Sequence, residues 1–155
     1  MTLARTMIII ALLMALFTAG ASAAGNAVTV WKSGGLAISG SSVSGDGTIA
    51  VAAGDVVMAF SKDGCKAWEW KAGDAVRHLA FGSKGELYAA YGTSITRLDG
   101  EGKEIWTQGT FDEMAYSLAV LPDGRPVLGY SRGVLCFEED GKPSWDHYAH
   151  EECDT

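Results

Sequence analysis

Short apolar runs separated by glycine-containing turns follow one another along most of the chain. The runs TIAVAA, DVVMAF, VRHLAF, ELYAAY and GVLCF have the length of strands, and most carry β-branched or aromatic residues. The dipeptides Asp46-Gly47 and Asp63-Gly64 are typical of hairpin turns, because glycine accepts the positive φ that these turns require. After the first two dozen residues, no stretch shows a helical period with caps. The pattern predicts an all-β protein.

The predicted strands belong to a unit of about 38 residues that repeats along the chain. Four tryptophans are spaced by 37, 38 and 39 residues, and a glycine lies four residues before each of the last three. These structural repeat residues are Trp31, Trp68, Trp106 and Trp145 with Gly64, Gly102 and Gly141. Between Gly47, Gly85 or Gly124 and the tryptophan that follows, the three copies align without a gap. Four short strands in a unit of about forty residues are typical of a β-propeller blade.

The middle unit illustrates the strands that we expect, at 76–81, 86–91, 94–98 and 103–106, in that order from the outer to the inner edge of the blade. The tryptophan stands on the last strand, where its large ring can pack between neighbouring blades. The segment AVTVW, residues 27–31, predicts an orphan N-terminal strand before the first complete unit. Three four-stranded antiparallel units are too few to close a ring, so we expect a propeller that is incomplete or completed by oligomerisation.

The run ITRLDGEGKEIW resembles the repeat of quinoprotein-like β-propellers, the PQQ-like and WD40-like class, whose blades commonly end in A-x-D-x-x-T-G-x-x-x-W. The three repeat glycines and the last three repeat tryptophans match this pattern, whereas acidic residues fill its threonine position. Some members of the family are dehydrogenases that hold pyrroloquinoline quinone and calcium. Others, such as the outer-membrane assembly lipoprotein type, bind no cofactor and use the propeller face to bind proteins.

The resemblance implies the cofactor-free branch of the family. Its quinone enzymes place a vicinal disulfide against the cofactor and hold calcium with carboxylates and an asparagine. This chain has no adjacent cysteines, and its one asparagine, Asn26, lies next to the N-terminal apolar segment. We therefore expect no cofactor.

Residues 1–23 have the composition of a secretory signal peptide. Arg5 precedes an uncharged apolar run from 7 to 17, and Ala21-Ser22-Ala23 offers an A-x-A cleavage site. The run is short for a bilayer span, which takes about 20 apolar residues, so an uncleaved anchor is the minor alternative. We expect export to the periplasm or the extracellular space, without membrane insertion after cleavage. The repeat domain would then occupy 24–146, followed by an acidic tail at 147–155.

The chain is acidic, with a formal net charge of −7. Of its 12 Lys and Arg residues only Arg5 lies in the leader, so the remainder carries 11 basic and 19 acidic side chains, a net charge of −8. Nucleic acids and anionic membranes would repel such a surface. The composition therefore argues against both as partners.

Three cysteines, Cys65, Cys136 and Cys153, lie in a chain that we expect to be exported, and disulfides persist in that environment. An odd number leaves at least one thiol unpaired within a monomer. Cys136 and Cys153 are close enough in sequence to pair. Cys136 also stands between Leu135 and Phe137, as a small buried apolar residue would. Both interpretations stay open.

The C-terminal segment DHYAHEECDT spaces His147, His150 and Cys153 at i, i+3 and i+6, which would place them on one side of a helix. Imidazole and thiolate are ligands of zinc and copper. Structural zinc sites, however, usually bring paired ligands together from two segments. We therefore expect a tail, or the start of a further blade, and assign no metal site.

Other candidate chemistry is weaker. The glycines around Lys103 in GEGKEIW lack the G-x-x-x-x-G-K-[ST] pattern of a phosphate loop, so this stretch predicts a hairpin turn. His78, with Arg77 beside it, has no recognisable nucleophile motif as a partner, and we expect a strand histidine with ordinary hydrogen bonds. Trp70 lies outside the repeat register and is either a stacking platform for sugar or additional packing between blades.

These observations predict a binding or scaffolding module without catalysis, whose partner is a second copy of the chain or another protein. The alternative from another class is a lectin-like oligomer, whose pockets between blades would use Trp68, Trp106 and Trp145. A third possibility is a truncated remnant of a quinone-dependent dehydrogenase.

Overall fold

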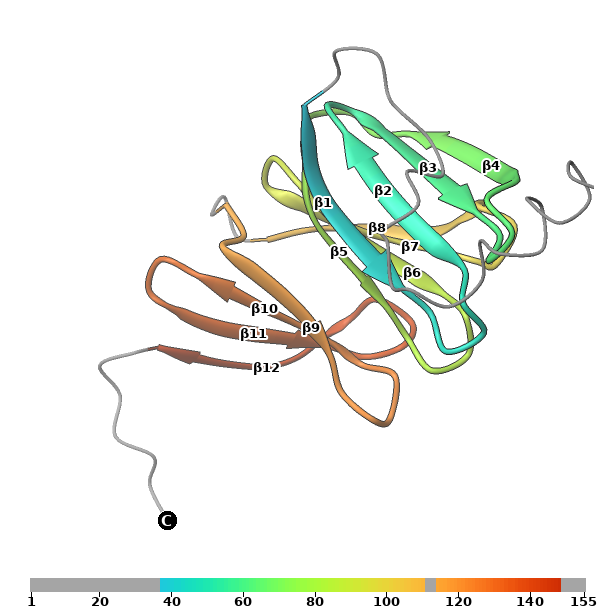
Figure 1. The fold of residues 1–155 in the computed structure, drawn as a ribbon. Coiled ribbons are helices and arrows are strands. Elements are labelled where there is room, and N and C mark those ends of the chain that lie inside the picture. The colour runs from blue at the N-terminus through green and yellow to red at the C-terminus, as the bar shows by residue number, and fades with distance from the viewer. Residues whose placement is uncertain (1–36, 111–113, 149–155) are drawn as a thin grey trace, which may run out of the picture. The chain divides into compact units, whose positions relative to one another are not determined.

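The computed structural model describes residues 37–110 and 114–148, and within these ranges the chain forms β-strands and no helix (Figure 1). The strands make three four-stranded antiparallel sheets, each with its strands in sequence order. None of the described residues forms a helix that could cross a membrane. The predicted all-β fold of three four-stranded units is confirmed. The first sheet contains β1 (Ile38–Val43), β2 (Ile49–Ala53), β3 (Val56–Phe60) and β4 (Lys66–Lys71). The second sheet contains β5 (Val76–Phe81), β6 (Leu87–Tyr91), β7 (Ser94–Leu98) and β8 (Glu104–Gly109). The third sheet contains β9 (Ser117–Val120), β10 (Pro126–Tyr130), β11 (Gly133–Phe137) and β12 (Pro143–Tyr148).

The hairpin turn before the last strand has the same geometry in all three sheets. A backbone N–H donates to a carbonyl four residues later, in the pairs Ser61–Cys65, Asp99–Lys103 and Glu138–Lys142, at 2.8, 2.9 and 2.8 Å. The register between the third and fourth strands shifts at one equivalent position in each sheet: Ala59/Phe60, Arg97/Leu98 and Cys136/Phe137. The sequence stretch GEGKEIW is therefore a hairpin turn, as predicted, and the repeat extends to details of the backbone.

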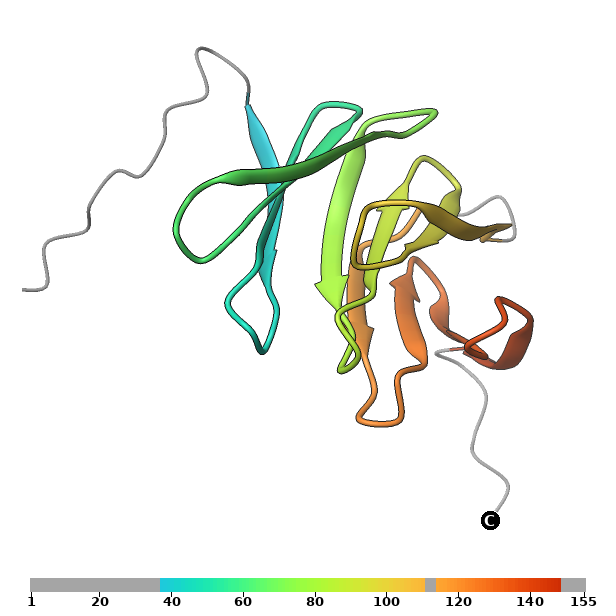
Figure 2. The ribbon, with the colours of Figure 1, turned by 90° about the vertical axis from the view of Figure 1, so that its right-hand side faces the viewer.

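The first strands of the three sheets lie beside one another, since β5 contacts both β1 and β9 (Figures 1 and 2). The expected order from outer to inner edge is therefore reversed: the first strand is the inner one and the last strand is the outer one. Small residues explain the close approach. A Cβ added at Gly40 would lie 3.1 Å from the backbone oxygen of Arg77, whereas the bulky tryptophans on the last strands need the wider space at the outer edge.

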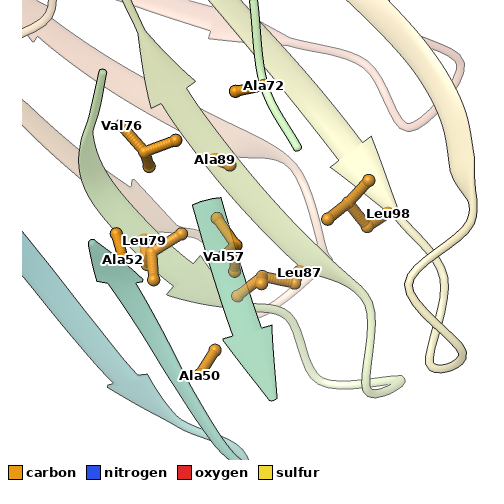
Figure 3. Packing of buried hydrophobic residues seen from close by; sticks show 9 residues of the cluster. All are labelled: Ala50, Ala52, Val57, Ala72, Val76, Leu79, Leu87, Ala89 and Leu98. Atoms are coloured by element: carbon orange, nitrogen blue, oxygen red, sulfur yellow. The ribbon is translucent and has the colours of Figure 1, made fainter. Parts of the chain in front are cut away.

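The first and second sheets share one hydrophobic core, shown in Figure 3. Ala50, Ala52 and Val57 of the first sheet face Leu87 and Leu98 of the second. Successive residues of a strand point to opposite faces, so the alternate residues of β2 face away from this core. Ala50 and Ala52 of β2 therefore point toward the second sheet.

The second and third sheets share another core, to which the second sheet contributes Tyr88, Ala90 and Ile95 and the third sheet Leu128 and Leu135. The middle sheet is thus covered on both faces, which explains why residues 87–90 of β6 are buried without interruption. A strand of this kind loses the alternating pattern of polar and apolar residues.

Several predicted features need correction or lie outside the described residues. β12 continues through Tyr148, so His147 and Tyr148 belong to the third sheet, and the boundary placed at residue 146 falls two residues early. A helix that includes His147 is excluded for the same reason. The signal peptide, the orphan strand with Trp31, and the tail residues His150 and Cys153 lie outside the described residues.

Candidate functional site

The repeat tryptophans join each sheet to the next. The ring of Trp68, on β4, covers Gly102 in the turn of the second sheet, and Trp106, on β8, covers Gly141 in the turn of the third. A Cβ added at Gly102 or Gly141 would lie 2.5 Å or 2.8 Å from the nearest ring atom. We call such a contact a seam, with a tryptophan half on one sheet and a glycine half on the next.

A hydrogen bond fixes each tryptophan on its turn. The Nε1–H of Trp68 donates to the carbonyl oxygen of Gly100 at 2.9 Å, and the Nε1–H of Trp106 donates to that of Glu139 at 2.9 Å. The acceptors occupy equivalent positions of the two turns. Each ring therefore packs its apolar face on a glycine and satisfies its polar edge with a backbone carbonyl. The prediction that tryptophans pack between blades is confirmed for these two.

The second seam also contains a buried charged pair. Glu86 is 4 % exposed, and its Oε1 lies 4.0 Å from Nη2 of Arg97. The other carboxylate oxygen accepts a hydrogen bond from the backbone N–H of Lys84 at 2.9 Å. Arg97 donates through Nη1 to the carbonyl of Glu139 at 2.7 Å, and therefore ties the pair to the third sheet. Removing one partner would leave a buried uncompensated charge.

A surface ion pair closes the same seam. The Nζ of Lys84 lies 2.7 Å from Oε1 of Glu139, and the two side chains are 62 % and 40 % exposed. The hydrogen bond from Lys84 lowers the pKa of Glu139 below its usual value. Exposed pairs of this kind contribute little to stability. The two positions nevertheless need opposite charges, because like charges there would repel each other.

Sequence reasoning did not find the Glu86–Arg97 pair. The positions equivalent to Arg97 in the other two units hold Ala59 and Cys136, both buried. An arginine at a position that is otherwise small and buried was the available signal. It indicates that a nearby acid must compensate the charge.

Tyr88 lies in the second seam and is fully buried. Its hydroxyl donates to the carbonyl of Gly124 at 2.9 Å, and its ring centroid lies 5.9 Å from that of Trp106. Burial raises the pKa of Tyr88 to about 12 from an ordinary value of 10.0, and the nearby Arg97 opposes part of this shift. The folded protein therefore resists ionisation of this phenol.

This pKa predicts a loss of stability at alkaline pH. Between about pH 10 and pH 12 the unfolded chain releases the Tyr88 proton and the folded chain retains it, so the stabilisation is complete below pH 10 and decreases as the pH rises. Each unit of pKa difference is worth about 1.4 kcal/mol. We expect urea unfolding at pH 9 and pH 11 to show this loss, with a smaller loss in Tyr88→Phe. An equal loss in both proteins would contradict the assignment.

Among the described residues, no further sheet packs on the second face of the third sheet, which we call the outgoing face. Leu128 and Leu135 point toward the second sheet, so the alternate residues point the other way. The register pairs Val127 with Cys136 and Cys136 with Trp145, which places all three on this opposite face. Trp145 is 43 % exposed, whereas Trp68 and Trp106 are only partly exposed. The outgoing face thus carries the tryptophan half of a seam with its ring open to solvent.

A hollow of about 340 Å³ lies beside the inner strands, and its lining includes Arg77, His78, Met114 and Tyr116. Nε2 of His78 lies 3.2 Å from the carbonyl oxygen of Ala115. A carbonyl oxygen only accepts, so Nε2 carries the hydrogen and donates it to Ala115. This hydrogen bond has a structural role, because it joins the second sheet to the segment before the third. The expectation of a histidine with ordinary hydrogen bonds agrees with this contact. Met114 and Tyr116 are exposed and add apolar surface at the rim.

A smaller hollow of about 190 Å³ lies between the first and second sheets, and its lining includes Asp46, Trp68 and Lys84. A tryptophan with polar neighbours is the combination that a sugar site requires. The carboxylate of Asp46, however, already accepts hydrogen bonds from Ser44 and from the backbone N–H of Thr48. One face of the Trp68 ring is also taken by Gly102. This arrangement leaves few groups of the hollow available to a sugar.

The remaining candidate residues have structural environments. Trp70 packs edge-to-face on Tyr91, with ring centroids 5.7 Å apart, which supports the interpretation as additional packing between sheets. Cys65 is an exposed free thiol, and Cys136 is fully buried, which raises its pKa. Within 37–110 and 114–148, no group of His, Cys, Asp and Glu has the arrangement of a metal site.

Comparisons with known proteins support the fold. No family model matches the chain, and no curated protein matches it. A protein of unknown function from Bacteroides caccae matches with a TM-score of 0.56 and 12 % identity, over 75 % of this chain and 47 % of that one. BamB from Moraxella catarrhalis matches with a TM-score of 0.63 and 14 % identity, over 72 % of this chain and 38 % of that one. The chain thus spans less than half the length of either neighbour, and at these identities the likeness shows a β-propeller-like fold alone.

Proposed function

We propose that this chain is an exported, non-catalytic β-propeller repeat protein that binds other protein chains. The observation that carries the proposal is the exposed ring of Trp145 on the outgoing face. Within the chain, the equivalent rings of Trp68 and Trp106 are used to bind the next sheet. A surface that binds a protein segment twice within the chain is suited to bind one from another chain.

The composition of the outgoing face fits a protein partner. Its centre is an aromatic ring beside small apolar side chains, and tryptophan is among the residues enriched at the centres of protein interfaces. The acidic charge of the chain makes nucleic acid an unfavourable partner.

Catalysis forms no part of the proposal. The one histidine lining the larger hollow is held by a backbone carbonyl, and the buried Glu86 is paired with Arg97 inside a seam. The sugar-binding alternative loses support because the rings of Trp68 and Trp106 are engaged by glycine turns. We likewise propose that residues 1–23 direct export, as the A-x-A motif before Ala24 suggests.

A photo-crosslinking amino acid at position 145 tests the proposal in the cell that makes the protein. Ile105 is the matched control position, because it is an exposed apolar residue on the outer strand of the second sheet, 51 % exposed. We expect a discrete protein adduct from position 145 and at least about a tenfold lower yield from position 105. Adducts of equal yield from both positions, or none from position 145, would count against a protein-binding face.

A further inference from the structure

We propose that the hollow beside the inner strands binds a carboxylate that carries an apolar or aromatic body, and that the guanidinium of Arg77 holds its charge. A small organic acid and the C-terminal end of a peptide share this chemistry. The hollow lies beside the first strands of the sheets, whereas the outgoing face is a face of the third sheet. The inference therefore goes beyond the proposed function and is tested separately from it.

Each of the three sheets contributes to the hollow one residue at the same position of the repeat. These residues, Ser39, Arg77 and Tyr116, each lie eight residues before the glycine of the next turn. The pairing of β1 with β2 skips Ser39, and the pairing of β5 with β6 skips Arg77, so both are the extra residues of β-bulges. A bulge re-aims a side chain, often next to a functional site. In the first two sheets, the bulges therefore direct this position toward the hollow.

Two hydrogen bonds between sheets hold the walls of the hollow in place. Oγ of Ser39 donates to the carbonyl of Val76 at 2.5 Å. Nε2 of His78 donates to the carbonyl of Ala115 at 3.2 Å, and this bond also fixes the segment that contains Tyr116. Val76 and Ala115 occupy equivalent positions of their units. Walls that are held in this way need little rearrangement to accept a ligand.

Arg77 is the charged group of the hollow that is available to a ligand. It is exposed, and it makes no hydrogen bond or ion pair with the rest of the described chain. Arg97 and Arg125, by contrast, are each paired with an acid. None of the described residues that line the hollow is acidic. In a chain with a net charge of −7, this guanidinium is therefore a local positive charge without a partner among the described residues.

The other lining residues favour an apolar body attached to the charge. Met114 and Tyr116 are 41 % and 66 % exposed and supply apolar contact area. Arginine binds carboxylates with two parallel hydrogen bonds. One guanidinium balances one negative charge, and the acidic chain disfavours ligands with more. The volume of about 340 Å³ lies near the lower end of the range for ligand sites, roughly 300–1,000 Å³, which suits a small acid or a chain end.

Titration calorimetry of the purified, exported chain with N-acetyl-phenylalanine and with its uncharged primary amide tests the inference. The two probes differ only at the carboxylate. We expect the acid to bind with a dissociation constant below about 1 mM, which a ligand of this size reaches at ordinary efficiency. The amide should bind at least about tenfold more weakly, and inorganic phosphate, which has no apolar body, more weakly than the acid.

A tetrapeptide that ends in phenylalanine with a free carboxylate distinguishes the two sources of the ligand. Binding comparable to that of N-acetyl-phenylalanine would identify the end of a peptide chain. Loss of binding, with the acid still bound, would identify a free organic acid.

Variants locate the site, and circular dichroism checks that each one is folded. Arg77→Gln should weaken binding of the acid at least about tenfold and leave the amide unchanged, whereas Arg77→Lys, which keeps the charge and loses the planar fork, should lie in between. Lys103→Gln is the matched control, because it removes the same charge from an exposed residue in the turn before the outer strand β8. Tyr116→Ala should weaken acid and amide alike, several-fold.

Four results would overturn the inference. They are a wild-type chain that does not bind the acid, equal binding of acid and amide, tighter binding of phosphate than of the acid, and equal effects of Arg77→Gln and Lys103→Gln. The first three need no variant, so they do not depend on whether a substitution disturbs folding.

Discussion

Replacing Trp106 with alanine is expected to lower the free energy of unfolding by about 3–5 kcal/mol, the range for deleting a large aromatic side chain from a core. The ring packs on Gly141, lies 5.9 Å and 6.2 Å from the ring centroids of Tyr88 and Phe137, and donates to Glu139. Its removal opens a cavity between two sheets and takes away one of the two hydrogen bonds that the carbonyl of Glu139 accepts, the other coming from Arg97. Urea unfolding followed by circular dichroism measures the loss.

The matched control for this change is Ile105→Ala. Ile105 is the preceding residue of β8 and is 51 % exposed, so its truncation should cost less than about 1 kcal/mol. All variants must be compared at one protein concentration, because association stabilises the folded state by mass action. A cost for Trp106→Ala no larger than that for Ile105→Ala would mean that the ring does not hold the second and third sheets together.

Adding one methyl group at Gly102 is expected to destabilise the protein more than adding the same group at Gly85. The φ values are 80° and 83°, so an alanine suffers the same backbone strain at both positions, roughly 1–2 kcal/mol. At Gly102 the new Cβ would lie 2.5 Å from Cδ2 of Trp68, whereas at Gly85 nothing lies within 4 Å. Trp68 cannot move aside without losing its bond to Gly100. We expect an additional cost of about 1–3 kcal/mol from this overpacking.

The difference in unfolding free energy between these two variants separates the cost of the contact with the tryptophan ring from the cost of backbone strain in the turn. Paired urea titrations of Gly102→Ala and Gly85→Ala measure it directly. In the background Trp68→Ala, where the obstructing ring is absent, the extra cost at Gly102 should disappear. An extra cost that persists without the ring would assign it to the turn itself.

The sequence predicted the sheets and the packing of tryptophans between them, because few other residues can fill these positions. A tryptophan every 38 residues with a glycine four positions earlier is a pattern that packing requires and chance rarely supplies. Trp68 and Trp106 lie on the last strands of their sheets, as predicted. Burial of the middle sheet on both faces explains why its strand β6 shows no alternation.

The order of strands from inner to outer edge could not be predicted in the same way. Alternation along a strand shows which residues share a face, but it does not show which edge of a sheet meets its neighbour. That edge depends on distances between sheets, such as the close approach of Gly40 to the backbone of Arg77. The glycine of β1 was visible in the sequence, but nothing indicated what it would approach.

The Glu86–Arg97 pair emerged only from the structure. Arg97 lies on β7, and Glu86 directly precedes β6, the strand that pairs with β7. The arginine at an otherwise small and buried position indicates that an acid is needed, but the sequence does not show which acid lies beside it. The raised pKa of Tyr88 follows from the same burial between sheets.

Crosslinking from position 145 in the cell that makes the protein tests most directly the claim that the outgoing face binds another protein chain. We expect a discrete protein adduct from position 145 and at least about a tenfold lower yield from the control position 105, where Ile105 is 51 % exposed. Equal yields from the two positions, or no adduct from position 145, would contradict the claim.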